Sequence, residues 1–313
     1  MVATQASGSK ILIQDIPGKG KGVISRQYFS KGDIVHTERP LLTQSLARNN
    51  STVLSALASC TPLEQSLFYQ LHNCHGARYP RELGIFETNV LPCGSNDSHG
   101  HVAAQGGLFL FAARFNSSCA PNLTNRWDAD RGVVVLRALR DIAPGEELCI
   151  GYGNLLASRA SRREELRRKF GFKCACDACA LEGQELEESD ERRRVLNQLY
   201  AAHTQGLCED PIEGIGQAML ALQYLRLERL PVYSSAFYFS GFHFCAAVSD
   251  FKSAVVWAAF AQRASRVAFG EQAAERWRRL VDDPTTYEDA GRLGKMTLAA
   301  PDAQAWAFLG LSL

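Results

Sequence analysis

The chain divides near residues 180 to 190, where the spacing of apolar residues changes, and no other sequence feature constrains the fold as strongly. Before this point, short β-branched or alternating segments are separated by Gly and Pro, which is typical of small β-sheets. After it, apolar residues recur every three or four positions, which is typical of helices. We therefore expect an α+β domain over residues 1 to 180 and an all-helical domain, paired as in helical-repeat arrays, over residues 191 to 313. The expected strands are Lys10 to Ile13, Gly22 to Ser25, Ile34 to Thr37, Gly132 to Ala138 and Glu147 to Tyr152.

Two segments interrupt the expected strands of the first domain. Residues 44 to 84 carry leucines at helical spacing, including Leu54, Leu57 and Leu71, so this stretch is expected to be a helical insertion. Pro92 to Gly107 is rich in Gly and is expected to be an irregular surface loop.

The second domain is expected to follow an acidic linker at residues 181 to 190. Acidic side chains crowd this stretch, and their mutual repulsion favours a solvated connection. Ser189 is expected to cap the first helix beyond it. Further along, Asp250 to Phe269 reads as a helix closed by Gly270, and a helix that ends before Pro284 is expected to pair with it.

The charge balance excludes a protein that attracts nucleic acid through a long-range field. The chain has 34 basic and 33 acidic residues and a net charge of +1. Its basic run from Arg159 to Lys169 contains Glu164 and Glu165, four positions before Arg168 and Lys169, so a solvated helix face is expected rather than nucleic-acid contact.

The apolar runs are much shorter than the roughly 20 residues that span a bilayer. The apolar trio from Ile11 to Ile13 is also shorter than the roughly 7 to 15 residues of a signal-peptide core. We therefore expect a soluble, monomeric intracellular protein, cytoplasmic or nuclear, with no membrane association.

Three of the ten cysteines have the spacing of metal ligands. Cys174, Cys176 and Cys179 form a Cys-x-Cys-x-x-Cys cluster, and a reducing compartment keeps such thiols free. Structural Zn²⁺ takes four ligands, so a fourth must come from elsewhere in the chain. A second set lacks paired Cys-x-x-Cys spacing, and free thiols and surface histidines are expected there: Cys60, Cys74, Cys93, His72 and His75.

A glycine strip lies between the first two expected strands, in Pro17 to Val23. Glycines at every second position let a backbone approach a ligand closely or take left-handed angles. No helical pattern follows, so neither a dinucleotide fingerprint nor a phosphate-binding loop fits. Taken alone, the strip favours a flexible β-turn over a ligand-binding loop.

The glycine strip and three later segments, in this order and spacing, resemble the SET-domain protein lysine methyltransferases. Asn116 to Asn122 resembles their Asn-His-Ser-Cys-x-Pro-Asn motif, and Gly145 to Tyr152 resembles their Gly-Glu-Glu-Leu-x-x-x-Tyr motif. Cys174 to Cys179 resembles their post-SET zinc motif. The resemblance covers about residues 11 to 180 and implies small sheets wrapped around a threaded C-terminal segment.

Within this family, the chain most resembles fungal proteins related to the SET-and-MYND branch. It carries their helical insertion and a Gly-Ile-Phe-x-Thr-Asn segment at Gly84 to Asn89, but it lacks the MYND zinc finger. The resemblance also implies that the C-terminal helices wall one side of a substrate cleft.

The resemblance implies S-adenosylmethionine as cofactor, one structural zinc ion, and a protein or peptide substrate with a target lysine. Cys119 would be the fourth zinc ligand; alternatively it is a buried small hydrophobe and another residue closes the cluster. Phe172 would cover the adenine, or else be a core aromatic. The implied cofactor-binding residues are Lys19, Gly20, Lys21, Asn89, Asn116, Ser117, Tyr152 and Phe172.

Tyr152 is the implied catalytic residue. Methyl transfer to lysine is an in-line displacement, so the enzyme must align the neutral amine with the methyl donor and exclude water. The alternative is a strand-end tyrosine without a role in chemistry. The sequence departs from the family pattern at Ser117, Gly151 and Asn154, where His, Ser and Asp are common. These departures leave two other functions open: a SET fold that serves small-molecule metabolism, and a non-catalytic interaction scaffold.

Overall fold

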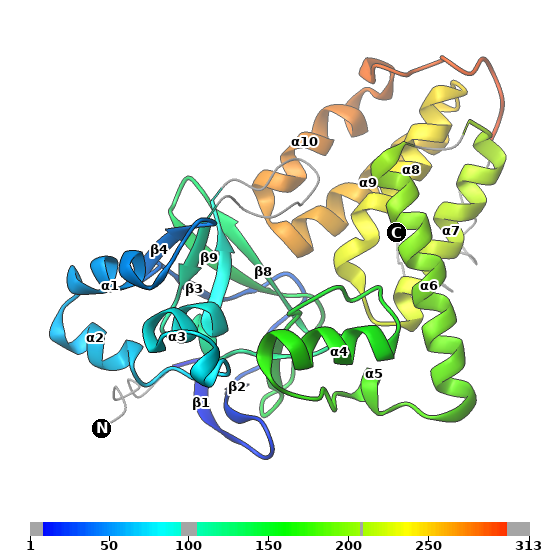
Figure 1. The fold of residues 1–313 in the computed structure, drawn as a ribbon. Coiled ribbons are helices and arrows are strands. Elements are labelled where there is room, and N and C mark those ends of the chain that lie inside the picture. Colours follow the sequence, from blue (N-terminus) through cyan, green and yellow to red (C-terminus); the bar gives the residue numbers. More distant parts are fainter. Residues whose placement is uncertain (1–8, 95–104, 207–208, 299–313) are drawn as a thin grey trace. The chain divides into compact units, whose positions relative to one another are not determined.

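The computed structural model describes residues 9–94, 105–206 and 209–298. The chain divides into two compact units (Figure 1). The first comprises residues 1–153 and 160–175, and the second comprises residues 154–159 and 176–313. Residues 154–159, directly after the Gly145 to Tyr152 motif, therefore belong to the second unit. The chain then returns to the first unit for residues 160–175 before it continues in the second.

Three small sheets form the first unit. Their strand orders are β1-β2-β10-β7, β3-β9-β8 and β4-β6-β5. The strands are β1 (Ile11–Ile16), β2 (Gly20–Ser25), β3 (Ile34–Glu38), β4 (Leu42–Ser45), β5 (Val90–Cys93), β6 (Gln105–Leu108), β7 (Asn116–Ser117), β8 (Leu123–Asp128), β9 (Val133–Ala138) and β10 (Glu147–Ile150).

The glycine strip forms the turn between β1 and β2. These strands pair antiparallel from Ile11 opposite Ser25 to Ile16 opposite Gly20. Gly20 has a φ of +71°, a backbone conformation that residues with a Cβ rarely adopt, so glycine suits this tight reversal. β10 lies between β2 and β7, antiparallel to the first and parallel to the second. Residues far apart in the sequence thus become neighbours in one sheet.

The expected insertion is helical. It contains α1 (Asn50–Ala58), α2 (Pro62–Phe68), the 3₁₀ helix η1 (Gly76–Arg78) and α3 (Arg81–Asn89). Capping boxes begin the first two helices, with Thr61 and Glu64 forming the second box. Phe68 and Phe86 are fully buried in the core that these helices share with β4 and β6.

The expected loop from Pro92 to Gly107 is wrong at both ends. β5 and β6 pair there, with Leu91 opposite Gly107. Gly106 and Gly107 lie in β6 because close packing, not a turn, requires them: a Cβ at Gly106 would lie 2.3 Å from Val90 Cγ2, and one at Gly107 would lie 2.8 Å from the Phe109 ring. Residues 95–104, between the two strands, lie outside the described residues.

Helices make up the second unit, and α8 packs on α9 and α9 on α10 (Figure 1). Gly270 ends α9 with a φ of +92°, as the sequence predicts. α8 is absent from the sequence expectations because it is apolar on every face and largely buried, so it has no amphipathic period. The helices of the second unit are α5 (Asp177–Ala180), α6 (Gly183–Gln205), α7 (Pro211–Leu227), α8 (Ser234–Ala247), α9 (Phe251–Phe269) and α10 (Glu271–Asp282), with the 3₁₀ turns η3 (Pro231–Tyr233) and η4 (Pro284–Thr286). The 3₁₀ turn η2 (Ala112–Arg114) and nearly all of α4 (Arg159–Phe170) belong to the first unit.

The expected acidic linker is wrong, because most of residues 181 to 190 belong to α6. Acidic side chains near a helix N-terminus interact favourably with the helix dipole. Further along the same helix, Glu188 pairs with Arg192, and Glu191 pairs with Arg194. Ser189 is not a cap but a buried residue inside the helix. The acidic residues therefore stabilise the start of a helix.

A buried ion pair joins α6 to the end of α7. Arg193 is fully buried, and its Nε lies 2.7 Å from Glu228 Oε2, which also accepts a 2.7 Å hydrogen bond from Ser189 Oγ. Arg193 also donates to the carbonyl of Leu155, in the short segment that follows the Gly145 to Tyr152 motif. The pair thus anchors that segment within the second unit.

Replacing Glu228 should destabilise the second unit strongly. In Glu228→Ala, the buried Arg193 loses its carboxylate, and breaking such a pair costs about 3–5 kcal/mol. The matched control is Glu271→Ala, which removes an exposed pair with Arg266 and should lower the unfolding free energy far less, because solvent screens exposed ion pairs. Urea titration measures both unfolding free energies, and equal losses would contradict the role of the buried pair.

The basic run from Arg159 to Lys169 forms α4, with Leu166 on its buried side. Glu165 pairs with Lys169 as expected, whereas Glu164 pairs with Arg167.

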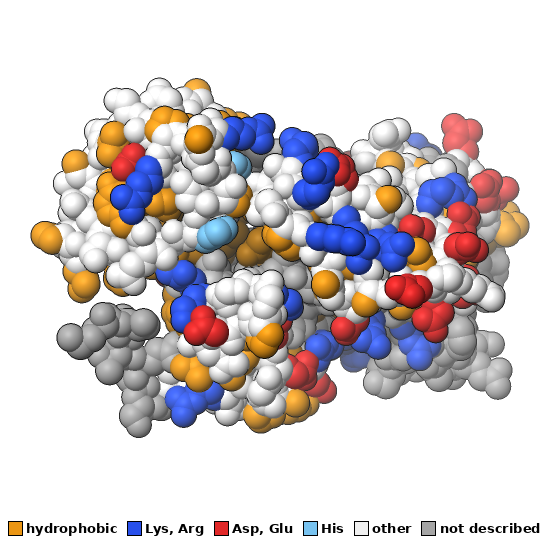
Figure 2. Space-filling view, turned by 60° about the horizontal axis from the view of Figure 1, so that its bottom comes forward, with side chains coloured by type: hydrophobic (Ala, Val, Ile, Leu, Met, Phe, Trp, Pro, Cys, Tyr) orange, Lys and Arg blue, Asp and Glu red, His pale blue; other side chains and the backbone are white. Residues whose placement is uncertain are grey.

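Basic and acidic side chains both occur across the face drawn in Figure 2. Among the described residues, no helix is long and apolar enough to cross a membrane.

Candidate functional site

The sequence motifs meet in the sheet that contains β2, β7 and β10. In the parallel pair of β7 and β10, Asn116 lies opposite Cys149 and Ser117 lies opposite Ile150. Ser118 donates its backbone N–H to Ile150, which continues the pairing beyond β7. This register places the Asn116 to Asn122 motif beside the Gly145 to Tyr152 motif. The last paired residue of β10, Ile150, precedes Tyr152 by two positions.

Glu147 contacts the side chains of Lys19 and Asn116 beside β10, and we call these three side chains the polar edge. Oε2 of Glu147 lies 2.5 Å from Lys19 Nζ, and its Oε1 accepts a 2.9 Å hydrogen bond from Asn116 Nδ2. Burial opposes the charge on Lys19, but the hydrogen bond and charge of Glu147 outweigh it and raise the pKa of Lys19. Glu147 was not among the expected site residues, although it is the second Glu of the Gly-Glu-Glu-Leu motif.

The glycine strip contributes backbone and space to the same edge. The Lys21 carbonyl accepts a 3.3 Å hydrogen bond from Asn116 Nδ2, while the Lys21 side chain turns to Asp15. A Cβ at Gly22 would lie 2.5 Å from Ile16 Cγ1, 2.7 Å from Asn116 Nδ2 and 3.2 Å from Glu147 Oε1. Glycine at position 22 therefore allows these side chains to lie against the strand.

Asn122 holds β10 in position through two hydrogen bonds to the backbone of that strand. It is buried, its Nδ2 donates to the Glu147 carbonyl, and its Oδ1 accepts the backbone N–H of Cys149 at 2.8 Å. The side chain thus takes the place of a strand partner along β10. Asn122 is the last residue of the Asn116 to Asn122 motif, and its contacts identify it as a positioning residue for β10.

Tyr152 is half-buried where β10 ends. Its hydroxyl donates a 2.7 Å hydrogen bond to the Phe115 carbonyl, and its ring lies 4.9 Å from that of Phe170. Burial, with smaller contributions from Cys149 and Glu147, raises the pKa of the Tyr152 phenol well above its usual range. The phenol therefore stays protonated near neutral pH and suits positioning rather than proton abstraction.

The other expected site residues have different surroundings. Ser117 is buried beside β10. Asn89 ends α3, and its Nδ2 donates to the carbonyls of His72 and Ile85 at 2.7 Å each. Phe172 is more than a third exposed in the segment after α4. The structure therefore groups Lys19, Asn116 and Glu147 by direct contact, while Asn89 makes contacts within the helical insertion.

The departures at positions 151 and 154 lie in the turn after β10. Asn154 Oδ1 accepts the backbone N–H of Leu156 at 3.0 Å. This is a local turn contact that an asparagine or an aspartate side chain makes equally well. The residue at position 154 therefore stabilises the chain direction beyond Tyr152.

Four cysteines form a group with the chemistry of a structural zinc site. The sulfur atoms of Cys119, Cys174, Cys176 and Cys179 all lie within 4.8 Å of one another, and Sγ of Cys119 lies 4.0 Å from Sγ of Cys174. A tetrahedron with Zn–S bonds of about 2.3 Å separates its sulfur atoms by about 3.8 Å, so the arrangement fits. Cys119 follows Ser117 by two residues, which ties this cluster to β7.

Comparisons with known proteins agree with these motifs. A family model described as the SET domain matches residues 20–153. The chain is 30% identical over 249 residues to the histone-lysine N-methyltransferase set5 of Schizosaccharomyces pombe, covering 78% of this chain and 74% of that protein. It is 33% identical over 122 residues to the protein-lysine N-trimethyltransferase SMYD5 of Danio rerio, covering 36% of this chain and 29% of that protein.

A third relative matches a shorter part of the chain. The human histone-lysine N-methyltransferase SMYD3 is 35% identical over 81 residues, covering 26% of this chain and 18% of that protein. The chain thus spans less than a third of the two SMYD relatives but most of the yeast protein. The SET-domain match and the long alignment confirm the resemblance: the chain belongs to the SET-domain protein-lysine methyltransferases, which use S-adenosylmethionine to methylate lysine side chains of proteins.

Proposed function

We propose that the chain methylates lysine residues of histones, with Tyr152 and the polar edge around β10 as its reaction site. The observation that carries this assignment is the meeting of Lys19, Asn116 and Glu147 from three sequence motifs beside the strand that leads to Tyr152. The name of the yeast relative, a histone-lysine methyltransferase, supports the substrate class and a nuclear or cytoplasmic place of action.

The residues at this edge suit a cofactor that carries both charge and hydrogen-bonding groups. S-adenosylmethionine supplies a methyl group on a positively charged sulfur when it is bound. Lys19 and Asn116 offer donors, Glu147 offers a carboxylate, and Gly20 keeps the turn free of a Cβ. In this proposal Lys21, Asn89, Ser117 and Phe172 complete the binding site.

The chain's own contribution to methyl transfer is positioning. The hydroxyl of Tyr152, held by the Phe115 carbonyl, is placed to orient the reacting groups in line. The substrate amine must be neutral, and transfer from water into an apolar site lowers the pKa of a lysine. Aromatic rings such as Phe170 beside Tyr152 favour a cationic product. No carboxylate base is needed in this scheme.

The smaller side chain of Ser117 is compatible with methyl transfer. It is buried where the family usually places His, and it leaves less side-chain volume beside β10. In this proposal the contacts between Asn116, Glu147 and Lys19 hold the polar edge without an imidazole. The small-molecule and scaffold alternatives receive no comparable support from a contact in the structure.

The four-cysteine cluster is proposed to hold one structural zinc ion. All four positions offer thiolates, the ligands that structural zinc prefers, and three of the four residues are buried. Bound zinc would tie Cys119, close to Asn116 and Ser117, to the segment that carries Phe172. Its role would be to stabilise the fold around the cofactor site and not to take part in methyl transfer.

A substitution at Gly22 tests the polar edge through cofactor binding. The Cβ in Gly22→Ala would collide with Ile16 Cγ1 and with the amide of Asn116, and it would crowd the carboxylate of Glu147. We expect the dissociation constant for S-adenosylmethionine to rise roughly tenfold or more, the scale of a lost hydrogen bond to a charged group. Isothermal titration calorimetry measures this change.

The control for Gly22→Ala is Gly216→Ala, because a Cβ at this exposed α7 position meets nothing within 4 Å. This variant should bind the cofactor as the wild type does. Unchanged cofactor affinity in Gly22→Ala would place the cofactor elsewhere. A wild-type protein that does not bind the cofactor at millimolar concentration would overturn the proposed function.

A further inference from the structure

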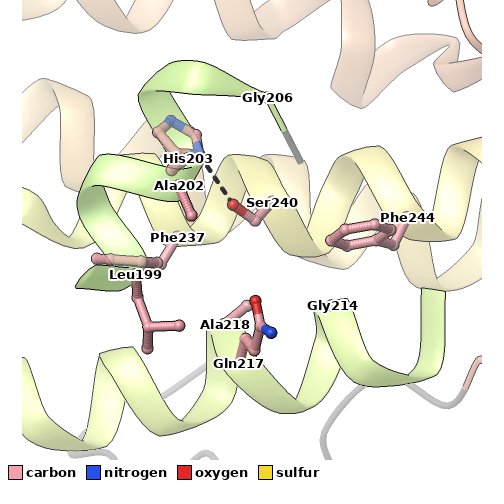
Figure 3. Close-up of a pocket in the computed structure, with 10 residues that line it drawn as sticks. All are labelled: Leu199, Ala202, His203, Gly206, Gly214, Gln217, Ala218, Phe237, Ser240 and Phe244. Atoms are coloured by element: carbon pink, nitrogen blue, oxygen red, sulfur yellow. Dashed lines mark hydrogen bonds between the residues drawn. The ribbon is translucent and has the colours of Figure 1, made fainter. Parts of the chain in front are cut away.

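A cavity of about 210 Å³ lies among α6, α7 and α8 of the second unit. Its walls include Leu199 of α6, Ala218 of α7, and Phe237 and Phe244 of α8 (Figure 3). It lies within one unit and uses no residue of the polar edge around β10. The proposed methyl-transfer function therefore leaves it without a role.

Small residues create this space, and aromatic rings border it. Ala218 is buried, and a Cβ at Gly214 would lie 2.1 Å from the Phe244 ring, so the ring packs directly on the backbone of α7. The cavity opens to solvent beside Ala202 and Gly206, which are exposed. A cavity of about 150 Å³ is known to hold a benzene molecule, so this one has room for one ring or two fused rings.

One polar atom is fixed at the wall. Gln217 Nε2 donates a 2.8 Å hydrogen bond to Glu213, which sets the orientation of the amide. In Figure 3 the amide oxygen of Gln217 points from α7 toward Ser240 of α8. A ligand between these helices therefore meets a hydrogen-bond acceptor, so it needs an N–H or O–H group of its own.

The remaining polar lining is neutral. His203 Nδ1 and Ser240 Oγ lie 3.0 Å apart and form a hydrogen bond with each other. Burial, and to a lesser degree His243, lower the pKa of His203, so the imidazole is neutral at pH 7. None of the lining side chains is an acid, a lysine or an arginine. The cavity thus has no charged group to compensate a phosphate, a carboxylate or an ammonium group.

We propose that this cavity binds a neutral aromatic small molecule of one or two fused rings that donates one hydrogen bond to Gln217 Oε1. The rings would lie between Phe237 and Phe244, and the donor group would face α7. Such a site is separate from methyl transfer, and its occupant would stiffen the contact between α7 and α8.

Indole and benzofuran are matched probes for this site, because they have nearly the same shape and only indole carries an N–H group. Isothermal titration calorimetry on the full chain should show that indole binds about fivefold more tightly, the scale of one hydrogen bond. In Gln217→Leu, which replaces the amide by a branched apolar side chain and so removes the acceptor, the two probes should bind equally. Gly216→Ala, one residue away and exposed, should retain the preference for indole.

A second variant tests whether the probes occupy the cavity. Ala218→Leu projects three more carbon atoms into it and should remove binding of both probes, while circular dichroism reports whether the helices remain folded. If Ala218→Leu does not fold, the comparison of Gln217→Leu with wild type decides. The proposal is wrong if wild type binds neither probe at millimolar concentration, if it binds both equally, or if folded Ala218→Leu binds them as wild type does.

Discussion

Replacing Tyr152 by Phe should lower kcat by roughly 10² to 10³ while folding and cofactor affinity stay close to those of the wild type. The substitution removes only the hydroxyl that donates to the Phe115 carbonyl, and the ring still packs on Phe170. A preorganised polar contact acts mainly in the transition state, so its loss appears in turnover. Single-turnover transfer of a labelled methyl group at saturating cofactor measures the effect.

Tyr69→Phe is the matched control for Tyr152→Phe. Its hydroxyl donates a 3.1 Å hydrogen bond to Glu82 within the helical insertion, away from β10. We expect its turnover to equal that of the wild type. A Tyr152→Phe enzyme with unchanged turnover would remove Tyr152 from the chemistry. Because the pKa of Tyr152 is raised, its ionisation should cause no loss of activity between pH 7 and the usual tyrosine pKa of about 10.

Replacing Cys119 by Ala should release the metal and destabilise the fold. Wild-type protein should contain about one zinc ion per chain, as a closed four-ligand site requires. With three thiolates left, the variant should lose most of this zinc, and its melting temperature should fall markedly, because structural zinc sites contribute on the order of 10 kcal/mol to folding. Elemental analysis and calorimetry measure the two effects.

Cys93→Ala serves as the control for Cys119→Ala. Cys93 is also a buried cysteine of the first unit, but it does not belong to the four-sulfur cluster. Its zinc content should equal that of the wild type. If Cys119→Ala retains full zinc and an unchanged melting temperature, Cys119 is a buried small residue and another group closes the site.

Local patterns were sufficient to predict much of the fold. Strand segments near Ile11 and Val133 have β-branched residues, and the α9 helix has both an apolar period and a terminal glycine, so each is encoded by its own residues. α8 was missed because burial on all sides erases the period that marks a surface helix. Gly106 was misread because the same residue type serves turns and close packing.

The candidate site shows a different limit of sequence reasoning. The sequence motifs identified the segments that form the site. The cofactor, the zinc ion and the protein substrate were implied by the family resemblance. The motifs did not show that Glu147 joins Lys19, 128 positions away, to Asn116. Nor did they assign Asn122 its two hydrogen bonds to β10. These contacts depend on the position of β10 between β2 and β7, and the residue pattern of each strand does not reveal which distant strands become its neighbours.

The most direct test of the account is to identify the atom that receives the methyl group. Recombinant histones are incubated with the enzyme and S-adenosylmethionine carrying a labelled methyl group, and tryptic peptides are analysed by mass spectrometry. We predict label on lysine side-chain nitrogens with the wild type and nearly none with Tyr152→Phe. Label confined to lysines of other proteins in a cell extract would overturn the histone assignment alone. No labelled lysine in any protein, at a cofactor concentration shown to saturate the enzyme, would contradict the account.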